Sequence, residues 1–134
     1  MKISLSAAAA ALLCLAGCNS YEPVTSAAEN GFRRDMKAVG EVLDFREIDT
    51  EKKEAPGGLA AVVRFESEIK WLTLEEALSR GGAARDTQEY LLKMEYASSR
   101  LGKSPRAGGS ASIKGAILMA KTDTGWIYKG LSAE

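Results

Sequence analysis

Two glutamates, Glu66 and Glu68, stand two residues apart in a stretch that alternates between apolar and polar side chains. In an extended strand such residues share one face, so their carboxylates would lie about 7 Å apart, within the separation that glycoside hydrolysis uses. Arg64 and Lys70 flank them on that same face. Exposed charges in a row of two bases and two acids usually pair for solubility, each contributing about 0–1 kcal/mol. We therefore expect a solvated charged row here rather than a catalytic pair.

Two short motifs resemble catalytic or phosphate-binding signatures. Ser67-Glu-Ile-Lys70 has the S-x-x-K spacing of the penicillin-recognising enzymes, but those enzymes place it at a helix start and need two further motifs. Gly102-Lys103-Ser104 has the ending of a phosphate-binding loop, but Ala97 stands where that loop needs a glycine, and Pro105 follows directly. We expect neither motif to carry its chemistry.

The composition removes further classes of function. The chain has 134 residues, 18 basic and 18 acidic side chains, no histidine and two cysteines. A net charge of zero lacks the basic surplus that displaces counterions from nucleic acid, so no nucleic-acid partner is expected. Without histidine, histidine-based triads and the common Cys/His zinc sites are excluded. The sequence thus predicts no catalytic residue, no metal ligand and no cofactor, and the protein is not expected to be an enzyme.

The N-terminus has the pattern of a secretion signal. Lys2 supplies a positive charge, and residues 3–16 are all apolar or small. These residues would span about 21 Å as a helix, short of the roughly 30 Å of a hydrocarbon core. The pattern therefore indicates a cleaved signal peptide rather than a membrane-spanning helix. It ends in Leu15-Ala16-Gly17-Cys18.

This ending resembles the lipobox of bacterial lipoproteins. The resemblance implies a signal peptide over residues 1–17, a diacylglycerol thioether on Cys18 with palmitate among its acyl chains, a tether over residues 18–25 and a single domain over residues 26–134. Asn19, in place of an aspartate, resembles the outer-membrane sorting signal of Gram-negative lipoproteins. We expect a lipid-anchored protein on the cell membrane, and on the periplasmic side of the outer membrane if the source is Gram-negative.

Hydrophobic spacing predicts the first elements of the domain. Ser26 to Glu29 fits a capping box that opens an amphipathic helix ending near Gly40. Its apolar face would hold Phe32, Met36, Val39 and Leu43, and its wet face Arg33, Arg34, Asp35 and Lys37. Residues 42–48 read as a strand, whose broken alternation requires a bulge or an early end.

The clearest strand covers residues 61–71. A polar turn is expected over residues 51–58 before it. The strand alternates over ten residues, which predicts one buried and one wet face. The expected inner face holds Phe65, Ile69 and Trp71 among others, and the outer face holds Glu66, Glu68 and Lys70.

The second half of the chain has mixed signals. Thr73 to Glu76 is a further capping box, for a short helix that stops at residues 81–82. Residues 86–101 fit a helix or a strand by spacing, and the run Ala97-Ser-Ser-Arg100 favours the helix. A loop over residues 103–110 and a hairpin of residues 112–120 and 126–131 would close the chain.

These elements predict an α+β domain, with an N-terminal helix packed on a curved antiparallel sheet and a helical insert. The order is similar to the cystatin-like and NTF2-like cone folds of small secreted bacterial proteins. The stretch from Ile113-Lys-Gly115 to Lys121-Thr-Asp-Thr-Gly-Trp126 is similar to the last hairpin of lipoproteins of that kind. Enzymes of the NTF2-like group use Asp, His or Tyr inside the cone. This chain has no His and no acid on the inner face of residues 61–71, so that chemistry is not expected.

Two functions remain open. The first is a non-catalytic interaction module that binds a protein partner in the cell envelope, through the outer sheet face or the loop over 103–110, with Lys114, Lys121 and Lys129 contributing charge. The alternative is a small apolar-ligand binder, or an NTF2-like enzyme, with a cavity between helix and sheet. The aromatic residues would either line such a pocket or fill the core: Phe65, Trp71, Trp126 and Tyr128. A deep cavity with a buried acid would favour the alternative, and a filled cone the first.

Overall fold

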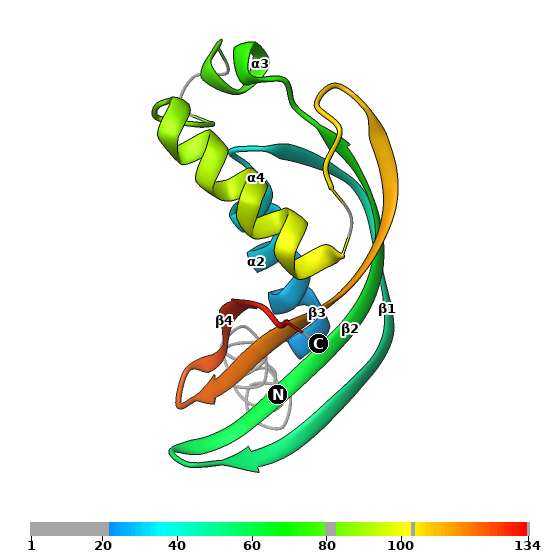
Figure 1. The fold of residues 1–134 in the computed structure, drawn as a ribbon. Helices are drawn as coiled ribbons and strands as arrows, with labels where there is room; N and C mark the ends of the chain where they lie inside the picture. Colours follow the sequence, from blue (N-terminus) through cyan, green and yellow to red (C-terminus); the bar gives the residue numbers. More distant parts are fainter. Residues whose placement is uncertain (1–21, 80–82, 103, 134) are drawn as a thin grey trace, which may run out of the picture.

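The computed structural model describes residues 22–79, 83–102 and 104–133. A curved antiparallel sheet of four strands, in the order β1-β2-β3-β4, carries the helices on its concave side, as predicted for an α+β fold (Figure 1). No described helix is long and apolar enough to cross a bilayer. The elements are α2 (Val24–Met36), β1 (Gly40–Ala55), β2 (Gly58–Trp71), α3 (Leu74–Ser79), α4 (Thr87–Leu101), β3 (Ser110–Thr122) and β4 (Gly125–Leu131).

Strand β2 follows its sequence pattern. Phe65, Ile69 and Trp71 are buried on the inner face, while Glu68 is exposed and Glu66 and Lys70 are half-buried. This confirms the predicted register, because β2 lies between β1 and β3 and has solvent over its outer face only.

Strand β1 is much longer than the predicted residues 42–48. Its pairing with β2 skips Leu43 and Ile48, so the expected irregularity is two bulges. Both skipped side chains are about half exposed, at 48% and 53%. The placement of Leu43 on a buried helix face was therefore wrong.

The polar turn predicted over residues 51–58 was also wrong. Glu51 to Ala55 remain in β1 and pair with β2, and only Pro56 and Gly57 form the turn. Gly57 has φ +96°, a conformation that favours glycine. Residues 51–55 of β1 are exposed on both faces, so their sequence shows no alternation that would predict a strand.

Helix α2 begins two residues before the predicted capping box. The carbonyl of Pro23 accepts the first helical hydrogen bond, from the amide of Ala27 at 3.0 Å, and no side chain caps the helix. Glu29, the expected box partner of Ser26, instead pairs with Arg33 at 2.9 Å. The box prediction was wrong because the chain is already helical at Ser26.

The later elements agree with the sequence. The Thr73 hydroxyl accepts from the Glu76 amide at 3.1 Å, and the Glu76 carboxylate accepts from the Thr73 amide at 3.0 Å, which is the predicted reciprocal cap. Residues 86–101 are resolved in favour of helix: Asp86 caps α4, and Gly102 ends it with φ +69°. The terminal hairpin of β3 and β4 is confirmed.

The space between α2 and the sheet is filled with apolar side chains. The Phe65 ring lies 4.7 Å from that of Phe32 and 5.0 Å from that of Phe45, measured between centroids. Around them the fully buried large side chains include Met36, Ile69, Ile113, Ile117 and Met119. Buried side chains therefore occupy the space between α2 and the sheet.

Candidate functional site

The acid closest to the core is Asp35, at the C-terminal end of α2. Its side chain is 11% exposed and receives three donors. The ammonium of Lys93 pairs with Oδ1, while the hydroxyls of Tyr96 and Tyr128 donate to Oδ2 at 3.0 and 2.7 Å. We call these four residues the Asp35 cluster. It joins α2 to α4 and β4.

Tyr96 extends the cluster to the end of the sheet. Its hydroxyl accepts a hydrogen bond from the Leu131 amide at 2.7 Å while donating to Asp35. One carboxylate therefore ties a helix, a second helix and the C-terminal strand together. The expectation that Asp35 lies on the wet face of α2 was wrong, because α2 is covered by the sheet on one side and by α4 and β4 on another.

Gly31 allows this arrangement. It lies one helical turn before Asp35, and a Cβ atom there would stand 2.3 Å from Cγ of Tyr128. The Tyr128 ring thus packs directly on the helix backbone and sends its hydroxyl toward Asp35. A glycine inside a helix is unfavourable by about 1 kcal/mol relative to alanine, and this unexplained glycine was the sequence signal for a close approach.

The environment keeps the tyrosines protonated. Burial, followed by the hydrogen bond and negative charge of Asp35, raises the pKa of Tyr128 above its ordinary value. Burial likewise raises the pKa of Tyr96. Both hydroxyls therefore act as donors at neutral pH, and Asp35 accepts all three hydrogen-bonding groups from its own chain. The arrangement fixes three elements together.

Beside the cluster, a groove of about 580 Å³ runs between α2 and α4, open to solvent. We call it the helix groove. One wall comes from α2, and the other from α4 and the turn before it. The main lining residues are Arg34 on α2 with Lys37 and Ala38 just after it, and Arg85, Asp86, Gln88, Glu89, Leu92 and Lys93 on the opposite wall.

Most charges of the helix groove are neutralised within the protein. Arg85 pairs with Glu89 at 2.6 Å, and this hydrogen bond lowers the pKa of Glu89 and raises that of Arg85. Lys93 pairs with Asp35. By contrast, within residues 22–79, 83–102 and 104–133, the side chains of Arg34 and Lys37 have neither an ion pair nor a hydrogen bond.

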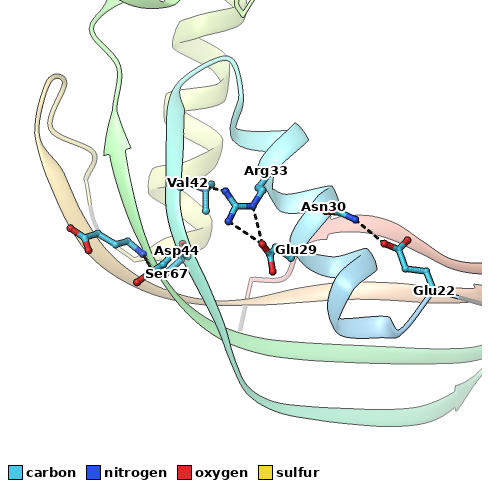
Figure 2. Close-up of polar contacts among 8 residues, drawn as sticks. Glu22, Glu29, Asn30, Arg33, Val42, Asp44 and Ser67 are labelled. Atoms are coloured by element: carbon cyan, nitrogen blue, oxygen red, sulfur yellow. Dashed lines mark hydrogen bonds and ion pairs between the residues drawn. The ribbon is translucent and has the colours of Figure 1, made fainter.

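The neighbouring Arg33 shows what an engaged arginine looks like on the same helix. Its guanidinium pairs with Glu29 and donates to the Val42 carbonyl at 2.7 Å, which attaches α2 to β1 (Figure 2). Arg33 is thus a structural residue. Arg34, one position on, turns toward the helix groove instead.

The expected surface pairing on β2 is present. Glu66 pairs with Arg46 at 3.5 Å, and Arg64 pairs with Asp49 at 2.9 Å, both across to β1. The Asp44 carboxylate accepts from the Glu68 amide at 2.7 Å.

The two sequence motifs have structural roles. Ser67 is buried, and its hydroxyl donates to the Asp44 carbonyl at 2.5 Å (Figure 2). Lys70, at the odd spacing of three residues, belongs to the other face of β2. Gly102 ends α4, while Lys103 lies outside the described residues.

The four aromatic candidates separate into different environments. Phe65 and Trp71 belong to the core. Tyr128 belongs to the Asp35 cluster, and Trp126 is half-buried, with Lys52 and Lys121 5.9 and 5.3 Å from its ring centroid. Within the described part of the chain they do not line a common pocket.

The lysines expected to form one surface are also separated. Lys114 and Lys121 are seven residues apart in β3, which pairs with β2 without a bulge, so they project from opposite faces. Lys114 stands opposite Glu66, and Lys121 opposite Trp126. A single basic patch on the outer sheet face was therefore a wrong expectation.

Cys18 and the predicted signal peptide over residues 1–17 lie outside the described residues. Across the described ranges, no group of three or more carboxylate or thiol side chains is arranged to hold a metal ion. Compared with protein-family models, curated proteins and solved structures, the chain matches none.

Proposed function

We propose that this protein is a lipid-anchored, non-catalytic interaction module of the cell envelope, and that it binds a protein partner through the helix groove. The anchor rests on the Leu-Ala-Gly-Cys ending of the signal sequence at Cys18. Val24 stands six positions after Cys18, so even an extended chain keeps the start of α2 within about 22 Å of Cys18. The domain would act in a thin layer beside the membrane, where confinement raises its effective concentration toward membrane partners.

The observation that carries the binding proposal is the pair of unneutralised cations beside an exposed apolar side chain. Arg34 and Lys37 line the helix groove without partners among the described residues, and Leu92 on the opposite wall is 58% exposed. Protein interfaces typically have an apolar centre that loses its water on binding and a polar rim around it, and arginine is enriched in them.

The packing favours this function over the binding of a small apolar ligand. Such a ligand would need an enclosed apolar cavity, and Phe32, Phe65 and Ile69 occupy the space between α2 and the sheet. The buried acid that catalysis would need as a free base is Asp35, and its carboxylate is engaged by Lys93 and two tyrosines.

Site-specific photo-cross-linking of the lipidated protein in its own cells tests the groove. A photoreactive side chain at Leu92 should give a discrete protein adduct, whereas the same group at Ile127, 47% exposed on β4, should not. An adduct of equal yield at both positions, or at Ile127 alone, would place the contact elsewhere.

The anchor is tested separately. Cys18→Ser should leave a precursor longer than the mature chain by the residues before Cys18, without incorporated palmitate. A variant that is still labelled by palmitate and still runs at mature size would rule out the lipid anchor.

A further inference from the structure

We infer that the helix groove recognises an acidic, extended segment of the partner, whose carboxylates pair with Arg34 and Lys37 while an apolar side chain packs on Leu92. This inference rests on the proposed function, because it takes the helix groove as the binding site and adds the chemistry of the partner.

The charged side chains of the groove indicate the sign of the charge that a partner segment would carry. On the opposite wall Arg85 pairs with Glu89, and the Asp86 carboxylate, which has no ion pair among the described residues, accepts from the Glu89 amide at 2.8 Å. Lys93 pairs with Asp35, so within the described chain the charged side chains of the groove without an ion pair are the two cations Arg34 and Lys37 and the one acid Asp86. On the α2 wall, Arg34 and Lys37 lie three residues apart and hence on the same side of the helix. An approaching carboxylate would meet two unneutralised cations there, whereas an approaching ammonium would be repelled.

The ordinary structural role of these cations does not use the groove. Basic side chains near a helix C-terminus interact favourably with the helix dipole by about 0.3–1 kcal/mol, and both Arg33 and Arg34 lie in the last turn of α2. This interaction needs no contact with the groove. The Lys37 amide donates to the Arg34 carbonyl at 3.3 Å, but neither the Arg34 nor the Lys37 side chain donates to a terminal carbonyl of α2 or to any other described group. Their side chains therefore remain available to a ligand, and the planar fork of Arg34 suits a carboxylate held by two hydrogen bonds.

The shape of the groove favours a segment over a small anion. Pockets for small molecules enclose most of the ligand surface, but this groove of about 580 Å³ is open and bounded by two helices. Gln88 and Leu92 stand one helical turn apart on α4 and face the two cations across it. The Gln88 amide could hydrogen-bond to a peptide backbone group, and Leu92 could pack against an apolar side chain. A peptide segment has both of these groups close together.

The inference is tested with a fluorescent peptide of glutamates around a central leucine, titrated against the lipidated mature protein in detergent micelles. The peptide should bind, and raising the salt from about 0.05 to 0.5 M should weaken it strongly, because screening shortens the reach of exposed charges. The same peptide with glutamines in place of glutamates should not bind.

The matched variants remove equal charge in two places. Arg34→Gln with Lys37→Gln should weaken peptide binding at least about tenfold, equivalent to about 1.4 kcal/mol. Lys114→Gln with Lys129→Gln should leave it within about twofold of the wild type, a difference of less than 0.5 kcal/mol. Both double variants should unfold close to the wild-type temperature, since all four side chains are exposed.

Three results would overturn the inference. They are equal weakening by the two double variants, failure of the acidic peptide to bind, and displacement of the peptide by citrate or inorganic phosphate at equal concentration. The last would mark a site for small anions. If the peptide fails while Leu92 still cross-links a protein in cells, the partner chemistry is wrong and the proposed function stands; if both fail, the groove is not the interface.

Discussion

Two regions that share α2 differ in how completely the chain satisfies them. Between α2 and the sheet, Phe32 and Met36 are fully buried among apolar neighbours. Between α2 and α4, the Asp35 cluster is also complete, but the helix groove next to it leaves Arg34 and Lys37 without partners in the described chain. Two faces of α2 are thus satisfied by contacts within the fold, and a third borders an open groove, to which the proposed function assigns recognition. Substitutions on each face should separate these roles.

The largest effect is expected in the apolar region. Phe65→Ala should lower the free energy of unfolding by about 3–5 kcal/mol, because it removes a buried ring that contacts Phe32 and Phe45. Glu68→Ala, on the exposed face of the same strand, should change it by less than about 0.5 kcal/mol. Urea unfolding followed by circular dichroism measures both. Similar losses from the two variants would mean that the strand does not have one buried face.

The Asp35 cluster should come next. Asp35→Ala should lower the free energy of unfolding by about 2–3 kcal/mol, because Lys93 and two tyrosine hydroxyls lose their acceptor. Asp35→Asn keeps one carbonyl acceptor and should lose less. If both variants unfold like the wild type, the cluster does not hold α2, α4 and β4 together.

Gly31 provides a test in which the expected change in stability is opposite to the change that helix propensity predicts. Alanine should stabilise an isolated helix by about 1 kcal/mol at this position. In the protein we expect Gly31→Ala to be destabilising by about 1–2 kcal/mol, because the new Cβ would meet Cβ and Cγ of Tyr128 at 2.5 and 2.3 Å. Thermal unfolding checks the sign. A gain in stability would show that the ring does not pack on the helix.

The smallest effect concerns pH. The folded-state pKa of Tyr128 is raised above its unfolded value near 10, so the contribution is complete below pH 10 and is lost as pH rises above it. The free energy of unfolding should fall there by up to about 1.4 kcal/mol per pH unit from this group. Tyr128→Phe should lose about 1 kcal/mol at pH 7, from its hydrogen bond to Asp35, and decline less steeply above pH 10. If the free energy of unfolding falls equally steeply above pH 10 in the wild type and in Tyr128→Phe, the Tyr128 hydroxyl is not buried as the structure places it.

The sequence predicted those elements of the fold whose pattern is set by neighbouring residues in the chain. The alternation of residues 61–71, the cap from Thr73 to Glu76 and the end of α4 at Gly102 were all legible, since each depends on neighbours within a few residues. The end of β1 over residues 51–55 could not be predicted as a strand, because its side chains are exposed on both faces and neither face had to be apolar.

Most of the candidate site could not be predicted from such local patterns. Asp35 was predicted on a wet face together with Arg34 and Lys37, and α2 by itself offers no means to separate them. The four aromatic residues were left as either core or pocket, and they proved to have three different environments. The periodicity of a segment reveals which face is buried by the sheet, but not which face a second helix covers.

By itself the sequence determined the α+β class and the buried face of β2, because burial against one layer produces a periodic pattern of apolar residues; for residues 86–101 it only favoured the helix over the strand. The tertiary structure alone decided that Asp35 is enclosed, that Gly31 must lack a side chain and that Arg34 borders an open groove. Asp35 meets Lys93 and Tyr128 across 58 and 93 residues of chain. Contacts at such separations are set by how α4 and β4 return to α2, and no local pattern encodes that return.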